Sequence, residues 1–318
     1  MTTLLVDDDP DILALLEATL EAFGYSNIQT AASGQAALDL IENAPAPFDL
    51  MLLDIQMPLM TGIELCSAIR ARPEYQFTPI IMVTAMSDQA HIDNAFAAGA
   101  TDYITKPFQF EDIKHRITLA ERASFQAEQL ANNAVALAGD GVGSGAGPRL
   151  GIEDAIPIDD VDGVLRLHAF ENYLAQMGRL EFSRTRLEIL TVTNISAIFE
   201  RSDSREFSDQ VTDIAECVSD AMRSFAPLIA YFGRGLYCIA VSSRCTKTLA
   251  ELSADIHAQI ETTGLVYRDG SPVTVDFELY DLGKRSFISP RSQVDFVKRM
   301  IRELKLAAHA SAPSMATN

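Results

Sequence analysis

The sequence predicts two α/β domains, the first of which contains a doubly wound parallel sheet. Short apolar segments alternate with amphipathic helical segments over the first 120 residues, which is typical of a parallel sheet covered by helices. The run Leu50–Leu53 is wholly apolar, as expected for a strand buried on both faces. A glycine-rich stretch, Gly139–Pro148, then divides the chain.

The first domain is expected to hold five strands, each followed by a helix. Asp9 before Pro10 predicts the N-cap of the first helix. The expected strands are 3–6, 27–30, 50–54, 80–84 and 102–105, and the helices are 10–20, 33–42, 63–71, 88–98 and one from Phe110.

Polar residues stand where these strands end. Asp7 and Asp8 follow the first strand, Asp54 ends the third, Thr84 ends the fourth and Lys106 follows the fifth. In open α/β sheets the chemistry lies at the carboxyl ends of the strands. Three carboxylates in one pocket need a compensating cation, for which Mg²⁺ is suited. The pattern indicates phosphoryl chemistry, with Asp54 as the nucleophile and Thr84 as a hydroxyl donor.

The motifs around these residues resemble the receiver domain of two-component response regulators. They are Val6-Asp7-Asp8, Leu53-Asp54 with Met57-Pro58 and Gly62, Val83-Thr84-Ala85, Gly99-Ala100 and Lys106-Pro107-Phe108, in order over about residues 1–121. The resemblance implies a flavodoxin-like fold and phosphorylation by a sensor histidine kinase or phosphotransfer protein.

The resemblance also implies a role for each residue. Asp54 would be the phosphoacceptor, and Mg²⁺ would be held by Asp7, Asp8, Asp54 and the backbone carbonyl of Gln56. Thr84 and Lys106 would contact the phosphoryl group, Tyr103 would be an aromatic switch, and Lys106-Pro107 is a candidate cis peptide. Two alternatives remain open, in which Tyr103 is an ordinary half-buried aromatic residue and Lys106 a solvated surface lysine.

Residues 122–156 are expected to form a helical extension and a linker. Helix-compatible sequence runs from Phe110 to Leu137, but small alanines occupy several of its seam positions. This favours a packed or solvated extension over a coiled-coil arm, so a homodimer stays an open alternative. Gly139–Pro148 predicts a flexible linker, and residues 307–318 are expected to be a disordered tail.

The second domain, residues 157–306, is expected to be a mixed-sheet α/β domain. Apolar periodicity predicts helices 165–177, 208–225, 249–262 and 290–306, and strands 186–192, 228–232, 236–241 and 273–279. The strands on either side of Gly233-Arg234-Gly235 predict a hairpin.

This order resembles the GGDEF domain of diguanylate cyclases, with Asp162-Gly163-Val164 and His168-Ala169-Phe170 near its opening helix and Ile229–Tyr237 at its signature hairpin. The metal-binding carboxylates of that family are missing, because Thr191 and Gly235-Leu236 occupy their positions. The inhibitory Arg-x-x-Asp motif is replaced by Ser224–Pro227. Arg223 is either its remnant or a helix-end cation, and Arg234 either contacts a nucleotide phosphate or is a solvated turn residue.

The charge, apolar runs and cysteines of the sequence argue against several classes of function. The 44 acidic and 25 basic residues give a net charge of −19, which argues against direct DNA binding. The sequence contains no apolar run long enough to span a bilayer and no basic signal-peptide start, so a cytoplasmic protein is expected. The four widely spaced cysteines suggest neither disulfides nor a zinc site.

We therefore predict a response regulator rather than an enzyme, signalling through an inactive GGDEF-like domain to an unidentified downstream protein. The alternatives are a phosphorylation-gated sensor of GTP or cyclic-di-GMP and, with less support, an active diguanylate cyclase.

Overall fold

The structure is a computed structural model that describes residues 1–85, 89–136, 150–158, 161–177, 182, 184–242, 245–282, 295 and 297–303. The chain divides into two compact units, Met1–Leu130 and Ala131–Asn318. The predicted linker at Gly139–Pro148 and the predicted tail at 307–318 lie outside the described residues.

The first unit contains the predicted five-stranded parallel sheet. Its strands are β1 (Thr2–Val6), β2 (Asn27–Ala31), β3 (Leu50–Asp54), β4 (Ile80–Thr84) and β5 (Asp102–Thr105), in the order β2-β1-β3-β4-β5. This is the flavodoxin-like strand order. Every residue of β3 and β4 is buried, which explains why their sequences are continuous rather than alternating apolar runs.

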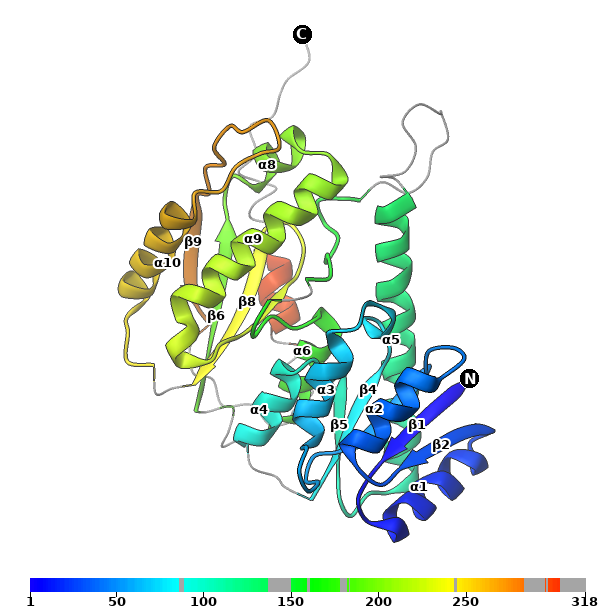
Figure 1. Cartoon of the computed structure of the whole chain (residues 1–318). Helices are drawn as coiled ribbons and strands as arrows, with labels where there is room; N and C mark the ends of the chain where they lie inside the picture. The colour runs from blue at the N-terminus through cyan, green and yellow to red at the C-terminus, as the bar shows by residue number, and fades with distance from the viewer. Residues whose placement is uncertain are drawn as a thin grey trace. The chain divides into compact units, whose positions relative to one another are not determined.

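Helices cover both faces of this sheet (Figure 1). They are α1 (Pro10–Ala22), α2 (Gly34–Asn43), α3 (Gly62–Arg70), α4 (Gln89–Ala97) and α5 (Phe110–Ala136), with a short 3-10 helix η1 (Pro73–Tyr75) after α3. Residues of α1 and α5 pack in one cluster against β1, β3, β4 and β5. The side chains of Asp9, Ser33 and Thr61 cap α1, α2 and α3, so the predicted Asp9 cap is confirmed.

Helix α5 is continuous well past the sheet. It runs without a break from Phe110 to Ala136, in agreement with the predicted helical extension. The hydroxyl of Tyr25 donates a hydrogen bond of 2.7 Å to Glu121 Oε1 and ties the middle of the helix to the start of β2. The first half of α5 is therefore held to the first unit by this hydrogen bond.

The second unit is built on four strands, β6 (Thr185–Val192), β7 (Leu228–Tyr231), β8 (Leu236–Ser242) and β9 (Phe277–Asp281). They lie in the order β7-β8-β6-β9 and pair antiparallel. A parallel bridge between Val164 and Ile229 at the β7 edge makes the pairing mixed, as predicted.

The predicted strand 273–279 begins later than expected. Val273 belongs instead to a small hairpin, in which its amide donates to the carbonyl of Leu265. The next residues are tied to the turn after β6, because the Asn194 side chain donates to Thr274 O and accepts from the amide of Asp276. These two tethers delay the β9 ladder to Phe277.

The helices of the second unit are α6 (Leu167–Gln176), α8 (Ile195–Arg201), α9 (Ser204–Met222) and α10 (Leu249–Thr263), and a 3-10 helix η2 (Arg223–Phe225) follows α9. The predicted helix 208–225 starts earlier, at Ser204, because Asp203 caps it. Helix α8 was not expected from the sequence. Residues 297–303 of the predicted helix 290–306 are helical, and most of the remainder lies outside the described residues.

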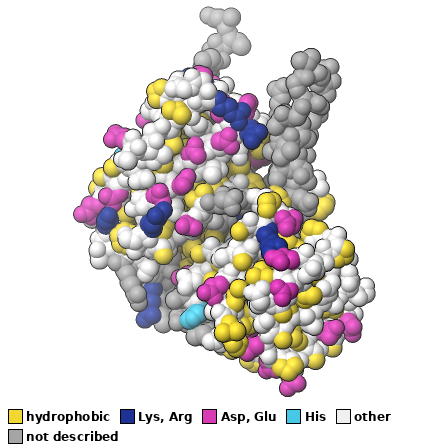
Figure 2. Space-filling view, viewed as in Figure 1, with side chains coloured by type: hydrophobic (Ala, Val, Ile, Leu, Met, Phe, Trp, Pro, Cys, Tyr) yellow, Lys and Arg dark blue, Asp and Glu magenta, His cyan; other side chains and the backbone are white. Residues whose placement is uncertain are grey.

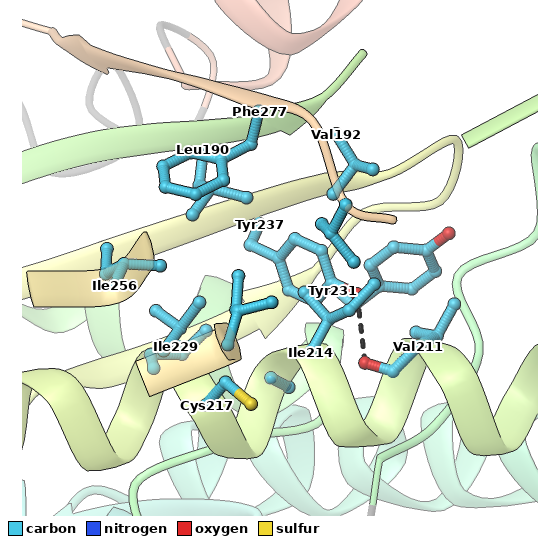
Figure 3. Packing of buried hydrophobic residues seen from close by; sticks show 14 of the residues in the cluster. Leu190, Val192, Val211, Ile214, Cys217, Ile229, Tyr231, Tyr237, Ile256 and Phe277 are labelled. Atoms are coloured by element: carbon cyan, nitrogen blue, oxygen red, sulfur yellow. Dashed lines mark hydrogen bonds between the residues drawn. The ribbon is translucent and has the colours of Figure 1, made fainter. Parts of the chain in front are cut away.

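One apolar core joins α9 and α10 to the sheet (Figure 3). Leu190, Ile229 and Tyr237 point from the strands toward α9, and Ile256 of α10 closes the cluster. The buried hydroxyl of Tyr237 donates a hydrogen bond of 2.9 Å to the carbonyl of Val211, so its polar atom is satisfied inside the core. Helix α6 packs on the opposite face, where Phe170 meets Phe232 edge to face.

Candidate functional site: a carboxylate cluster at the strand ends

The predicted site residues of the first unit come together because of the strand register. Val6 pairs with Leu53, so Asp7 follows β1 beside Asp54 at the end of β3. Thr84 ends β4 opposite Thr105 of β5, and Lys106 follows directly. The crossover between β1 and β3 is the point where strand order reverses, which is where ligands bind in such sheets.

Asp7, Asp8 and Asp54 form an acidic cluster. Asp7 and Asp54 are buried, whereas Asp8 is exposed, and each contributes an oxygen to a group whose atoms lie within 4.8 Å of one another. Among the described residues, these three aspartates are the group of His, Cys, Asp or Glu side chains that lie close enough together to hold a metal ion. A set made only of oxygen donors, partly open to water, fits Mg²⁺.

Lys106 supplies positive charge inside this cluster. Its Nζ lies 2.7 Å from Asp7 Oδ2 and 2.6 Å from Asp54 Oδ1, so it is not a solvated surface lysine. Burial raises the pKa of the Asp54 carboxyl, although Lys106 acts in the opposite direction. Burial lowers the pKa of Lys106, but its hydrogen bonds to Asp54 and Asp7 outweigh this and leave the pKa raised.

Backbone groups fix the two buried carboxylates. The amide of Gln56 donates to Asp54 Oδ2 at 2.6 Å, and the amide of Asp9 donates to Asp7 Oδ1 at 3.0 Å. Gly62 allows α3 to start against the end of β3, since a Cβ there would lie 2.0 Å from the carbonyl oxygen of Asp54. The Asp54 carboxylate is thus oriented before any ligand arrives. The predicted carbonyl ligand role of Gln56 stays a prediction.

The remaining receiver residues lie beside this cluster in the fold. Thr84 is buried, its carbonyl accepts from the amide of Lys106 at 2.7 Å, and the Lys106-Pro107 peptide is cis as predicted. Tyr103 is buried rather than half-buried. Its ring meets Phe96 edge to face, and Arg116 lies over it. This inward position is compatible with the predicted switch role.

In the second unit, the positions expected to carry metal ligands hold none. Thr191 of β6 pairs directly with Leu236 of β8, and neither side chain is a carboxylate. Gly235 packs on Ile195 and Val192, where a Cβ would lie 2.9 Å from Ile195 Cβ. Arg223 is exposed and pairs with Asp220.

Arg234 differs from one of its two sequence interpretations. Its side chain is only 9% exposed and pairs with Glu153 at 2.5 Å, so it is not a solvated turn residue, and its contact with a nucleotide phosphate stays a prediction. The two residues are 81 positions apart, and sequence reasoning did not connect them. The sequence does hold a signal that this segment belongs to the second unit. Leu150, Ile152, Ile156 and Ile158 are apolar and lie two or four positions apart directly after the linker. All four pack on the core of the second unit, which thus starts before residue 157.

Two further expectations concern the surface. No helix in the described part of the chain is long and apolar enough to cross a membrane. Figure 2 shows acidic side chains scattered over the visible face of both units, with few basic ones between them. That face offers no basic patch of the kind that binds a phosphate backbone.

Comparison with known proteins places the first unit. Residues 3–118 match the family described as the response regulator receiver domain. The chain is similar to the transcriptional regulatory protein YvrH of Bacillus subtilis, with 38% identity over 130 residues that cover 41% of this chain and 53% of the relative. It is also similar to the signal transduction histidine-protein kinase BarA of Escherichia coli, with 39% identity over 119 residues that cover 37% of this chain and 12% of the relative.

Among solved structures, the chain is similar to the chemotaxis response regulator CheY4 of Vibrio cholerae. The identity is 36% and the TM-score 0.35, and the match covers 38% of this chain and 98% of the other. The chain spans about half the length of the Bacillus relative.

Proposed function

We propose that this chain, whose N-terminal unit is the receiver domain of a two-component response regulator, is phosphorylated on Asp54 by a sensor histidine kinase or phosphotransfer protein and signals through its second unit by protein interaction. The observation that carries the proposal is the oriented Asp54 carboxylate, buried at a strand end beside Lys106 and the two other acids. A receiver accepts its phosphoryl group on aspartate, and of the two buried aspartates of this cluster Asp54 is the one that forms the last residue of a strand, β3.

The chemistry follows from the positions of the side chains. An oxygen of Asp54 attacks the phosphorus of a phosphohistidine, a phosphorus–oxygen bond forms as the phosphorus–nitrogen bond breaks, and the imidazole leaves with a proton. Asp7, Asp8, Asp54 and the Gln56 carbonyl would hold Mg²⁺, which when bound neutralises phosphoryl charge. Lys106 donates to a phosphoryl oxygen in place of its present carboxylate contact, and the Thr84 hydroxyl donates to another.

We infer that the second unit is a degenerate relative of the GGDEF domain without cyclase activity. Cyclisation of GTP requires carboxylates for two metal ions. The neighbouring positions Thr191 and Leu236, on which the resemblance places such carboxylates, cannot supply them. GTP turnover by the purified chain would contradict this inference.

The test of phosphorylation is direct. Full-length protein is incubated with acetyl phosphate and Mg²⁺, and intact-mass spectrometry measures the phosphoryl adduct. We expect one adduct on the natural chain and none on Asp54→Asn, whereas the control Asp39→Asn, an exposed α2 carboxylate, keeps it. An adduct that persists on Asp54→Asn would refute the assignment of Asp54.

A further inference from the structure

The loop between β3 and α3 carries an apolar side chain that projects wholly into solvent. Leu59 is fully exposed, more so than any other large apolar residue in the described part of the chain. Single exposed apolar residues are common on protein surfaces and need no explanation by themselves. Leu59 differs from these because the backbone around it is also unusual, and because it lies in the loop that follows Asp54.

The backbone at Leu59 forms a strained turn. Its φ is +71°, in the left-handed region that favours glycine or asparagine over leucine. The amide of Met60 donates a hydrogen bond of 2.8 Å to the carbonyl of Pro58, across Leu59 alone. A bond of this span with a positive φ at its central residue is characteristic of the rarer, strained form of γ-turn. Leucine therefore stands here against the local preference of the backbone.

Residues on both sides hold this turn in place. Met57 before it is buried, and Met60 after it packs on the start of α2, where a Cβ on Gly34 would lie 2.7 Å from Met60 Sδ. The side chain of Thr61 then caps α3. Because its neighbours on both sides are fixed, Leu59 is held at the apex of a well-anchored loop with its side chain in water.

The loop lies at the mouth of the phosphoacceptor site. It begins directly after Asp54, and the amide of Gln56 donates to Asp54 Oδ2 at 2.6 Å. A phosphohistidine must come within bonding distance of the Asp54 carboxylate, and it arrives on a protein far larger than the phosphoryl group. The surface of that protein therefore extends over the exposed residues around Asp54, of which Gln56, Pro58 and Leu59 follow it in sequence. A downstream partner has no such requirement, and a small donor such as acetyl phosphate covers almost nothing.

We propose that Leu59 is an apolar anchor for the protein that donates the phosphoryl group, and that it inserts into an apolar depression beside the donor's phosphohistidine. This inference rests on the proposed phosphorylation of Asp54 and names the surface chemistry of its donor. Full burial of a leucine side chain strengthens binding by a factor of about ten or more. Because the turn is already fixed, only the rotamer freedom of one side chain is lost when the donor binds.

The experiment measures phosphotransfer to the full-length chain from purified histidine kinases and phosphotransfer proteins of the same organism, each radiolabelled on its phosphohistidine. The donor with the highest kcat/KM for the natural chain is then used with the variants. Leu59→Asn keeps the turn, because asparagine accepts a positive φ, but removes the apolar side chain. We expect its KM to rise at least about tenfold and its kcat to change less than about twofold, as for a lost docking contact.

Two matched variants separate this anchor from the loss of an exposed apolar side chain in general. Leu59→Met keeps an apolar side chain and should transfer within about twofold of the natural chain. Phe125→Gln removes another exposed apolar side chain, in the second half of α5, and should also transfer as the natural chain does. An equal rise of KM in Phe125→Gln and Leu59→Asn would overturn the assignment of Leu59 as a specific anchor.

Acetyl phosphate tests the site without a protein donor. With Mg²⁺ it should label Leu59→Asn at the natural rate, and the melting temperature of this variant should be no lower than that of the natural chain, because asparagine relieves the strain. A labelling defect that acetyl phosphate shares would overturn the proposal, since Leu59 would then act within the site. An unchanged KM for the protein donor in Leu59→Asn would overturn it as well.

The remaining outcomes distinguish this proposal from the proposed function. If acetyl phosphate labels Asp54 of the natural chain but no phosphohistidine protein does, the anchor has no donor and is refuted, while the assignment of Asp54 stands. If Leu59→Asn alters the sedimentation of the phosphorylated chain but not its phosphotransfer, Leu59 contacts a second copy and the proposal is overturned. Labelling at a residue other than Asp54 would contradict the proposed function instead.

Discussion

Each unit of this chain holds a cationic side chain against carboxylates near the end of a strand. The two arrangements differ in the balance of positive and negative charge. In the receiver, Lys106 serves Asp7 and Asp54 together while Asp8 stands exposed beside them. In the second unit, the largely buried guanidinium of Arg234 pairs with Glu153, which lies 81 residues earlier in the chain. An excess of carboxylates marks a site that needs an incoming cation, whereas an ion pair of one cation and one carboxylate shows no such excess.

The largest effect is expected from Lys106→Ala. Without divalent cations this change leaves Asp7 and Asp54 buried and unpaired, and we expect the free energy of unfolding to fall by about 3 kcal/mol. Urea unfolding measures it. Millimolar Mg²⁺ should restore part of the loss, because it replaces the missing positive charge.

Phosphorylation provides a second readout of the same variant. Lys106→Ala should still accept phosphate from acetyl phosphate, but partner affinity should no longer respond to it. A variant as stable as the natural chain without Mg²⁺ would show that Lys106 is not the compensating cation.

Glu153→Gln tests the ion pair of the second unit. It removes the ion pair between Arg234 and Glu153, whose side chain is 46% exposed, so we expect the free energy of unfolding to fall by about 1–2 kcal/mol. Urea unfolding with a probe in the second unit measures this loss. Glu216→Gln is the matched control, and an equal loss in both variants would mean that the pair of Arg234 with Glu153 contributes nothing particular.

The pH dependence of Asp54→Asn sharpens the contrast. Burial raises the pKa of Asp54 above the ordinary 3.8, so the folded state binds its proton more tightly than the unfolded state. The natural chain therefore loses stability relative to Asp54→Asn as the pH rises from below 3.8 through the raised pKa. Thermal melts of both proteins between pH 3.5 and 7 without Mg²⁺ should show the melting temperature of the natural chain falling relative to that of Asp54→Asn as the pH rises.

If instead the natural chain gains stability relative to Asp54→Asn as the pH rises, Lys106 affects the pKa of Asp54 more than burial does. With Mg²⁺ present the trend should weaken, because the ion favours the carboxylate.

Arg223→Ala should have the smallest effect. Its pair with Asp220 joins an arginine that is 72% exposed to a neighbour on the same helical segment, and such pairs contribute less than about 0.5 kcal/mol. Urea unfolding should hardly distinguish this variant from the natural chain. A loss as large as that of Glu153→Gln would show that burial does not determine how much each ion pair contributes to the free energy of unfolding.

The receiver could be predicted from its sequence in fold and in most of its site. Its central strands β3 and β4 are continuous apolar runs, and the polar residues at the strand ends converge through the parallel register. What the sequence could not give is the contact geometry, such as the two hydrogen bonds of Lys106 or the inward position of Tyr103, because these depend on packing between separate helices and strands.

The second unit was harder for physical reasons that particular residues show. Helix α8 has seven residues, too few to display a period, and only Ile195 and Ile198 of its side chains are buried. Arg234 pairs with Glu153, 81 residues earlier, and no local pattern reveals that pairing. Its fold class could be predicted from strand and helix order, but the relation to the GGDEF family remains our proposal.

The packing of Gly233 and Gly235 has a consequence for mutational scanning. A side chain on Gly233 would collide with the backbone of Glu153 and Asp154, and one on Gly235 with Ile195. Saturation mutagenesis would therefore report a Gly-Arg-Gly turn that tolerates few substitutions, as a nucleotide-binding loop also would. At these two glycines the intolerance would follow from packing within the chain itself, so it would not by itself indicate a nucleotide site.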